Sequence, residues 1–358
     1  MARFQGEFGL QFVTHLANHY TLRDLVRLAH LAEQKGFAQI WVNDNVRYRG
    51  QLQVLTAIAA SVPIRLGTAV LVPYFHQVLD LADSFAAISE LCEGREISVG
   101  LARGDLGQAP QHVEVIKPVA MVRETAQFLR RALRGEEIAY ADFPLLCEYY
   151  RLNPKGKFRL AFKTRSPFSF YSGGNGPQAL RMCGRTMDGV ISSGTFIPML
   201  RTGRQAKMLA LADEAARAAT PGKRLRKMCE LNVSISRDRA QAIEFPKRQA
   251  AHSVLQWEAR GFTKEDYDAL GVKREQVLRL KECFTSGATV EEAAAFVTED
   301  IVRACYVAGR PDEVVEQILN LSGAASELGY DHIAFAKLGP NYEEAIHLLA
   351  EEVVPALR

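Results

Sequence analysis

The sequence lacks the patterns that mark membrane proteins and nucleic-acid-binding proteins. No stretch approaches the ~18 uninterrupted apolar residues that a membrane span needs, and the first residues lack the apolar core of a signal peptide. The formal net charge is only +3, and Lys and Arg are interspersed with Asp and Glu. No basic run is interleaved with aromatic residues, as nucleic-acid binding would favour. We therefore expect a soluble, cytoplasmic protein that binds neither nucleic acid nor membrane.

The cysteines and histidines also lack the spacing that is typical of metal sites. The six cysteines are scattered and form no CxxC pair, which argues against a zinc site or a disulfide framework and fits a reducing compartment. The chain has no HExxH motif. His15 and His19 are four residues apart, but they lie in a strand-to-loop segment, where that spacing does not put them on one face. We predict no metal site.

What the sequence does contain is a regular alternation of strand-like and helix-like segments, typical of parallel α/β architecture. The 358 residues have room for two ordinary domains or for one large α/β barrel. Eight strand-like runs, each followed by a helical pattern, cover residues 8–14, 39–42, 65–72, 96–102, 168–171, 189–192, 228–235 and 332–338. This count predicts a (β/α)8 TIM barrel that forms a single domain over residues 1–358.

A doubly wound open sheet is the competing architecture. It would carry a GxGxxG loop after the first strand, whereas this first strand ends in Thr14 and His15. Two segments are longer than ordinary connections. Residues 136–165, after the fourth strand, are predicted to be a partly extended excursion over the barrel mouth. Residues 239–301, after the seventh strand, are predicted to be a mostly helical insertion.

Some helix limits are visible in the sequence. Residues 22–35 form an amphipathic pattern with Thr21 as the capping residue. A single helix is predicted over residues 199–218, and Pro177 suits the first turn of the helix that follows the fifth strand, because the missing N–H would be unpaired there.

Glycine and hydroxyl side chains follow two consecutive strands. The fifth strand runs into Ser-Gly-Gly-Asn-Gly-Pro at residues 172–177, and the sixth into Ser-Gly-Thr at residues 193–195. Glycine lets the backbone approach a ligand, and the free N–H groups at helix starts favour anions. We predict a wall that binds phosphate. The alternative is that the first of these loops is simply a tight turn.

The carboxyl ends of barrel strands line the active site, so the order of the strands supplies a set of candidates. These are Gln11, Thr14, His15, Asn43, Asp44, residues 68–70, Arg103, Asp105, residues 172–176, residues 193–195, Asn232 and Lys337.

Eight short motifs then follow one another along nearly the whole chain. They are FGL at 8–10, IWVND at 40–44, LGTAV at 66–70, LCEGR at 91–95, VGLARGD at 99–105, GNGP at 174–177, CGRTMDGVI at 183–191 and AGRPDEV at 308–314. In this ordered set the chain resembles the bacterial-luciferase-like superfamily of flavin- and deazaflavin-dependent oxidoreductases. It is most similar to the coenzyme F-420-dependent methylenetetrahydromethanopterin reductases. The resemblance implies an enzyme on a luciferase-like TIM barrel.

The resemblance also implies two catalytic candidates. Asp44 falls where the family places a polar residue that contacts the deazaflavin or the substrate. Gln11 falls where such reductases often carry a carboxylate, proposed as the proton donor to the pterin, and an amide cannot donate a proton at neutral pH. The second strand ends in Asp44-Asn45, where many deazaflavin dehydrogenases have Asp-His. The substrate can therefore differ from that of the namesake reaction. As an alternative, Asp44 could only cap the helix after the second strand.

For the coenzyme, the resemblance implies a bulge on the third strand beneath the ring, with a non-proline cis peptide between Ala69 and Val70. It also implies a set of residues around the ring, the phosphate and the tail. The coenzyme-binding candidates are Thr68, Ala69, Val70, Arg103, Gly174, Asn175, Gly176, Ser193, Gly194 and Thr195. As an alternative, Arg103 is an ordinary member of a surface ion pair.

Three functions remain open at this point. The first is an oxidoreductase that passes a hydride between coenzyme F-420, an 8-hydroxy-5-deazaflavin, and a small organic substrate with a C=N or C=C group or a one-carbon pterin. The second is an FMN-dependent luciferase-like monooxygenase. The third is a non-catalytic family relative that binds flavin or a partner protein. The family resemblance further predicts a homodimer or a homotetramer.

Overall fold

The structure is a computed structural model, and it describes residues 4–104, 109–193 and 195–358. Eight of its strands lie within two residues of the eight predicted ones at each end. The strands are β1 (Glu7–Phe12), β2 (Gln39–Val42), β3 (Arg65–Leu71), β4 (Ile97–Leu101), β5 (Ile138–Ala139), β6 (Lys157–Phe158), β7 (Phe168–Ser172), β8 (Gly189–Ser192), β9 (Arg226–Ile235), β10 (Val307–Gly309) and β11 (His332–Gly339).

The main sheet has nine strands in the order β10-β9-β11-β1-β2-β3-β4-β7-β8, and β9 also pairs with β8. The pairs from β1 to β4, β4–β7 and β7–β8 are parallel. A parallel sheet that closes on itself, with helices between its strands, is a (β/α)8 TIM barrel, as predicted. The ninth strand, β10, pairs in parallel with the end of β9. It was not predicted because three residues between two helices show no alternation.

The helices account for most of the remaining chain. They are α1 (Leu22–Gln34), α2 (Gln51–Ala59), α3 (Val78–Leu91), α4 (Ala109–His112), α5 (Pro118–Ala132), α6 (Pro144–Tyr150), α7 (Pro177–Thr186), α8 (Phe196–Arg201), α9 (Arg204–Ala219), α10 (Arg239–Glu244), α11 (Lys247–Ala259), α12 (Lys264–Leu270), α13 (Arg274–Thr285), α14 (Val290–Ala294), α15 (Glu299–Cys305), α16 (Pro311–Glu327), α17 (Tyr342–Leu348) and α18 (Val354–Leu357). Short 3-10 turns η1 (Pro73–Phe75) and η2 (Tyr140–Asp142) and a π-helical turn η3 (Leu349–Val353) complete them. Within the described ranges, no helix is both long enough and apolar enough to cross a membrane.

Local chemistry sets several helix limits. Thr21 caps α1 through a reciprocal pair of hydrogen bonds with Asp24. Pro177 occupies the first turn of α7, as predicted. The single helix expected over residues 199–218 is wrong: the chain forms α8 and α9, separated at Gly203, whose φ of +68° is left-handed.

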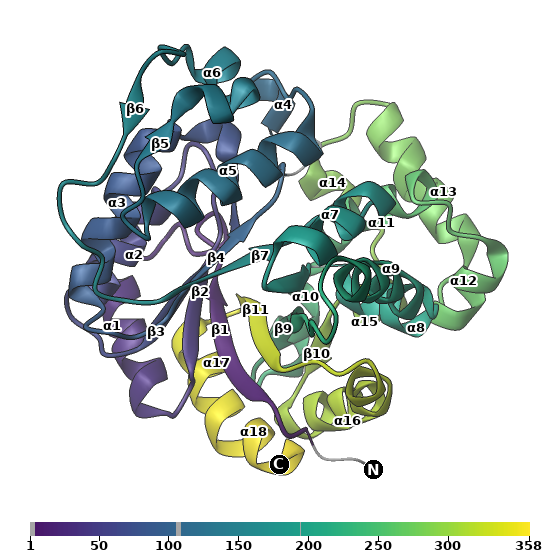
Figure 1. Ribbon diagram of the computed structural model, residues 1–358. Coiled ribbons are helices and arrows are strands. Elements are labelled where there is room, and N and C mark those ends of the chain that lie inside the picture. The colour runs from purple at the N-terminus through teal and green to yellow at the C-terminus, as the bar shows by residue number, and fades with distance from the viewer. Residues whose placement is uncertain (1–3, 105–108, 194) are drawn as a thin grey trace. The chain divides into compact units, whose positions relative to one another are not determined.

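The chain divides into two compact units, and the first comprises Gly9–Ile191 and Met208–Met228. In this unit α1 packs on α2, α2 on α3 and α3 on α5, and Figure 1 shows these helices beside strands β2–β4. Strands β2, β4 and β8 are buried along their whole length. Such continuous burial is expected for parallel strands that are covered on both faces.

The excursion over residues 136–165 belongs to the same unit. It contains β5, which pairs antiparallel with β6, and the helix α6. The hydroxyl of Tyr150 on α6 donates a hydrogen bond to the carbonyl of Pro73 at 2.5 Å, and Tyr149 packs edge-on against Tyr74. Because Pro73 and Tyr74 directly follow β3, α6 lies at the carboxyl end of that strand. That the whole excursion covers the barrel mouth stays a prediction.

The second unit comprises Met1–Phe8, Ser192–Lys207 and Cys229–Arg358. It contains the predicted helical insertion, which consists of α10 to α15. Helix α11 packs on α13, α14 and α15, and Trp257 on α11 stacks on Phe262 and lies against Tyr267. These aromatic contacts give the insertion a core of its own. The prediction of a single domain over residues 1–358 stays a prediction.

Candidate active site

The carboxyl half of β3 departs from a regular strand. The peptide bond between Ala69 and Val70 is cis, and the pairing of β3 with β4 shifts register between Thr68 and Leu71. The predicted bulge and its cis bond are therefore confirmed in the structure. That these residues contact a coenzyme stays a prediction.

Side chains from the bulge and from β1 hold this backbone in place. The Nε2 of Gln11, a buried side chain, donates a hydrogen bond to the carbonyl of Ala69 at 2.6 Å. The hydroxyl of Thr68 donates to the carbonyl of Gly100 on β4 at 2.9 Å. A Cβ at Gly100 would lie only 2.3 Å from the carbonyl oxygen of Thr68, so only glycine fits there. Gln11 and Thr68 thus fix the shape of the bulge.

Asp44 lies at the end of β2, and its carboxylate binds the segment that follows β3. The side chain is 6% exposed. Its Oδ2 accepts a hydrogen bond from the N–H of Val72 at 3.0 Å and lies 2.7 Å from Nε2 of His76. The N–H of Asp44 donates to the carbonyl of Val70. The alternative that Asp44 caps the next helix is wrong, because α2 begins after Gly50 and has no side-chain cap.

His76 completes a carboxylate–imidazole pair that the sequence analysis missed. An ionised carboxylate only accepts hydrogen bonds, so the Nε2–H of His76 donates to Asp44. No hydrogen bond to Nδ1 is found among the described residues, and the side chain is 19% exposed. An imidazole fixed in this way can take up or release a proton at its second nitrogen. The candidate set ended at the strand ends, whereas His76 lies on the far side of the turn η1.

A second imidazole lies near the ends of β1 and β2, with a different partner. Nδ2 of Asn45 lies 2.8 Å from Nδ1 of His15. The Oδ1 of Asn43 accepts hydrogen bonds from the N–H and the hydroxyl of Thr14. The amide of Asn45 thus fixes the orientation of the His15 ring.

Tyrosines form an apolar margin next to the pair. Burial raises the pKa of Tyr74 to about 12 and also raises the pKa of Tyr150. The hydroxyl of Tyr74 donates to the carbonyl of Ile116 at 2.6 Å. These phenols therefore stay neutral in the physiological pH range.

Arg103 is exposed and makes no ion pair within the described part of the chain, so the alternative of a surface ion pair has no support there. Asp105 lies outside the described residues.

The loop between β7 and α7 has the properties of an anion site. Gly176 is the N-cap residue of α7, and no side chain caps this end of the helix. A Cβ at Gly176 would meet nothing within 4 Å, whereas one at Gly174 would lie 2.7 Å from the Cβ of Ala179. The N-terminus of α7 therefore has open space beside Gly176, which suits a phosphate. That Gly174, Asn175 and Gly176 bind the coenzyme phosphate stays a prediction.

The second predicted loop, residues 193–195, belongs to the other unit. Its Gly194 lies outside the described residues, and Ser193 precedes it. The hydroxyl of Thr195 accepts a hydrogen bond from a guanidinium nitrogen of Arg260 at 2.7 Å, and a second nitrogen of Arg260 donates to Gln256. A guanidinium is a good phosphate ligand. No signal in the sequence links Arg260, which comes from the helical insertion, to this loop.

The structure thus brings Gln11, Asp44, Thr68, Ala69 and Val70 together at the bulge. The joint wall formed by the two glycine loops stays a prediction. Of the other strand-end candidates, Lys337 lies over the ring of Tyr306 at 5.8 Å. Over residues 4–104, 109–193 and 195–358, no group of three or more His, Cys, Asp and Glu side chains could hold a metal ion.

Comparison with known proteins agrees with this geometry. The profile of the luciferase-like monooxygenase family matches residues 7–334. The 5,10-methylenetetrahydromethanopterin reductase of Archaeoglobus fulgidus is 25% identical over 357 residues, which cover 98% of this chain and 100% of the relative. The F-420-dependent glucose-6-phosphate dehydrogenase of Beutenbergia cavernae is 28% identical over 357 residues, which cover 96% and 95%.

Solved structures share the fold. The coenzyme F-420-dependent tetrahydromethanopterin reductase of Methanopyrus kandleri superposes with a TM-score of 0.74 at 22% identity, and the match covers 99% of this chain and 100% of the other. An F-420-dependent secondary alcohol dehydrogenase gives a TM-score of 0.71 at 19% identity, with coverage of 99% and 100%. Since the family profile spans most of the sequence, the resemblance found in the motifs is confirmed. The chain is an enzyme of the luciferase-like monooxygenase family.

Proposed function

We propose that the protein is an oxidoreductase that uses coenzyme F-420 to pass a hydride to or from a small organic substrate. The observation that carries this proposal is the bulged end of β3, with Asp44 and His76 held beside it. The open N-terminus of α7 belongs to the same unit and supports a site for the coenzyme phosphate. The names of the reductase and dehydrogenase relatives support the deazaflavin in particular.

When bound, the deazaflavin ring supplies the hydride chemistry, and the protein supplies binding, orientation and the exclusion of water. Gln11 and Thr68 fix the bulge of Ala69 and Val70, and this bulge would hold the ring. The loop of Gly174, Asn175 and Gly176 would hold the phosphate beside the N-terminus of α7. Arg103 would contact the tail. The binding of the phosphate by Ser193, Gly194 and Thr195 stays a prediction.

His76 handles the proton that accompanies hydride transfer, and Asp44 positions it. The buried carboxylate fixes the orientation of the ring through Nε2. Nδ1 of His76 then donates a proton to the substrate, or accepts one in the opposite direction. His76 thus supplies the proton donor that a carboxylate at the position of Gln11 would otherwise provide. The amide of Gln11 itself donates a hydrogen bond to a backbone carbonyl. The substrate class is a small molecule with a C=N, C=C or C=O group.

An FMN-dependent monooxygenase is the second candidate, because the family profile carries that description. A flavin ring would use the same bulge and the same phosphate loop. A non-catalytic relative would have no need to keep Asp44 and His76 as a buried pair. A cytoplasmic location and a homodimeric or homotetrameric state are part of the proposal.

The test is a direct coenzyme titration. The purified protein is titrated separately with F-420 and with FMN, and binding is followed by the fluorescence of each coenzyme. We expect F-420 to bind at least about 10-fold more tightly than FMN, a difference of about 1.4 kcal/mol. Tighter binding of FMN, with oxygen consumption that depends on substrate, would support the monooxygenase instead. Binding of neither coenzyme would favour a non-catalytic relative.

A further inference from the structure

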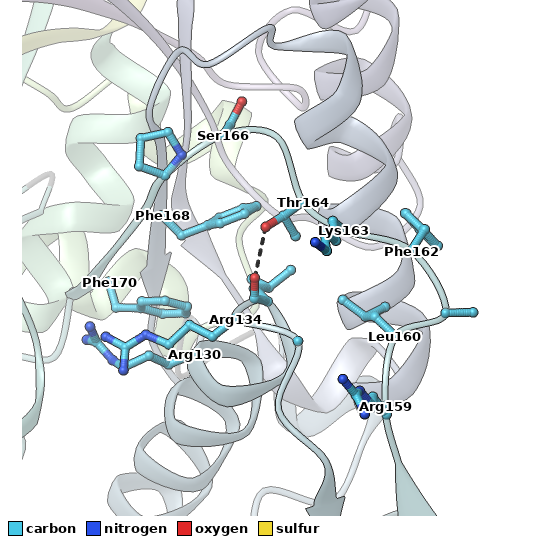
Figure 2. Close-up of a pocket in the computed structure, with 14 residues that line it drawn as sticks. Arg130, Arg134, Arg159, Leu160, Phe162, Lys163, Thr164, Ser166, Phe168 and Phe170 are labelled. Carbon is cyan, nitrogen blue, oxygen red and sulfur yellow. Dashed lines mark hydrogen bonds between the residues drawn. The ribbon is translucent and has the colours of Figure 1, made fainter.

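A separate cavity lies in the unit of Gly9–Ile191, at the amino end of β7. Its volume is about 730 Å³, within the range of roughly 300–1,000 Å³ that is common for ligand pockets. The end of α5 forms one wall, and the extended segment over residues 159–168 forms the other (Figure 2). Parallel strands point the same way, so this cavity lies at the opposite end of the strands from Asp44 and His76.

The polar lining of the cavity is cationic. It contains Arg130, Arg134, Arg159 and Lys163 and no Asp or Glu. Arg130 lies on α5, and Arg134 lies in the turn over residues 133–135 that follows this helix. Figure 2 shows Lys163 across the cavity from both. Positive charges that lie close together favour the binding of an anion between them.

Only one of these cations is clearly neutralised by a neighbour. Arg130 binds both carboxylate oxygens of Asp188 at 3.0 and 3.2 Å and lies over the ring of Phe170. Within the part of the chain that the structure describes, neither Arg134 nor Lys163 forms an ion pair or a side-chain hydrogen bond. Both side chains are exposed and can rearrange around a ligand.

The hydroxyl groups of the cavity are already engaged. Thr164 donates a hydrogen bond to the carbonyl of Leu133 at 2.9 Å, the dashed line in Figure 2. Ser166 donates to the carbonyl of Ser89 at 3.0 Å. Polar recognition in the cavity must therefore come from the cations, and a ligand without negative charge has little to bind there.

Apolar groups complete the lining. Phe162 is 39% exposed, and its neighbours in the cavity include Leu160 and Phe168. An exposed aromatic ring beside guanidinium and ammonium groups offers a stacking surface next to an anion site.

We propose that this cavity binds an organic polyanion of nucleotide size that carries an aromatic ring. The negative charges lie between Arg134 and Lys163, and the ring packs against Phe162. Phosphate groups suit the site because arginine binds them through two parallel hydrogen bonds and lysine as a point charge. The proposal does not depend on the function of the strand-end site.

The test uses three probes and isothermal titration calorimetry at constant ionic strength. ATP carries both the charge and the ring, tripolyphosphate carries the charge alone, and adenosine carries the ring alone. We expect ATP to bind most tightly, tripolyphosphate more weakly and adenosine not measurably. Raising the salt concentration from 50 to 300 mM weakens ATP binding, because exposed charges are screened.

Variants separate the two parts of the ligand. The double variant Arg134→Ala/Lys163→Ala raises the Kd for both ATP and tripolyphosphate by about 10-fold or more. The variant Phe162→Ala raises the Kd for ATP about 3-fold and leaves that for tripolyphosphate unchanged. The matched control Lys155→Ala/Arg217→Ala removes two exposed charges outside the cavity, and it changes either Kd by less than about 2-fold. Each altered side chain is exposed, so we expect all variants to fold, which circular dichroism verifies; Lys163→Ala alone serves if the double variant does not.

Several results would overturn the proposal. One is the absence of ATP binding to the wild-type protein. Another is an equal loss of binding in the control double variant, since attraction to the overall charge would then explain it. Unchanged binding in Arg134→Ala/Lys163→Ala would place ATP at another site. Binding of a polyglutamate peptide without binding of ATP would identify a surface for an acidic protein instead.

Discussion

In the unit of Gly9–Ile191, the two ends of the strands differ in how their charged side chains are paired. At the carboxyl end, Asp44 is nearly buried and both of its hydrogen-bond donors are fixed by the chain. At the amino end, Arg134 and Lys163 have no partner within the described residues. A preorganised pair can act on a bound substrate without rearrangement. Cations without a partner, in contrast, gain the most favourable interaction energy when they bind an anion. The first arrangement suits chemistry and the second suits binding.

The largest effect that sharpens this comparison is expected for His76→Gln. The glutamine amide can still donate a hydrogen bond to Asp44, but it cannot carry a proton. We expect kcat with F-420 and substrate to fall by about 10²–10³-fold, the usual contribution of a general acid or base. The Kd for F-420, measured by fluorescence, should change by less than about 3-fold, because a proton-transfer role leaves ground-state binding unchanged.

His30→Gln on α1 is the matched control for this substitution, since it removes an imidazole that lies within a helix and not at a strand end. We expect its kcat to stay at the wild-type value. A fall in kcat of less than about 3-fold in His76→Gln would contradict the proposed proton transfer. A parallel loss of coenzyme binding would show instead that His76 only shapes the segment after β3.

The next prediction compares Arg130 on α5 with Arg134 in the turn that follows this helix. Arg130→Ala removes a two-point ion pair, a hydrogen bond to the carbonyl of Thr186 and the contact with Phe170. It should lower the free energy of unfolding by about 1–2 kcal/mol, because the pair is partly exposed. Arg134→Ala should change it by less than about 0.5 kcal/mol. Urea unfolding followed by circular dichroism measures both, and equal effects would show that Arg134 has a structural partner.

Much of this architecture was predictable from the sequence. Apolar runs of four to eight residues, bounded by glycine, proline and polar residues, located all eight barrel strands, because buried parallel strands read as continuous apolar segments. The cis bond between Ala69 and Val70 followed from the family resemblance of the third strand. The strand ends then gave Asp44 and Gln11 as neighbours of the bulge.

Other features depend on contacts between distant segments and could not be predicted. His76 faces Asp44 only because the turn η1 folds the chain back across the end of β2. Arg260 reaches Thr195 from the helical insertion, 65 residues further along the chain. The partner of Gln11 is a backbone carbonyl on another strand, which composition does not reveal. The hydrophobic periodicity of the sequence predicts helices and strands. Which polar groups form pairs depends on their positions in space, which periodicity does not give.

The third prediction concerns the phosphate loop and tests whether the carboxyl end of the strands holds the coenzyme. Gly176→Ala adds a methyl group where nothing lies within 4 Å, at a φ of −78° that alanine accepts. The melting temperature should therefore stay within about 1 °C of wild type, while the Kd for F-420 rises by about 10-fold as the methyl group meets the phosphate. Unchanged F-420 binding would remove Gly176 from the coenzyme site. Binding of ATP to the cationic cavity should not change.

The smallest effect is expected from Tyr74→Phe, which tests how far water is excluded beside Asp44. The variant loses the hydrogen bond to Ile116, so its free energy of unfolding at pH 8 should be about 1 kcal/mol lower than that of wild type. Burial raises the pKa of Tyr74 to about 12 in the folded protein, whereas an unfolded tyrosine titrates near about 10. The contribution of the neutral phenol is therefore complete below pH 10 and is lost as the pH rises toward 12. Urea unfolding at pH 8 and pH 10.5 should show the difference between the two proteins shrinking at the higher pH. If the difference in the free energy of unfolding between the two proteins stays the same at both pH values, the phenol is as hydrated as the exposed cations of the cavity. The two ends of the strands would then differ only in how their charged side chains are paired.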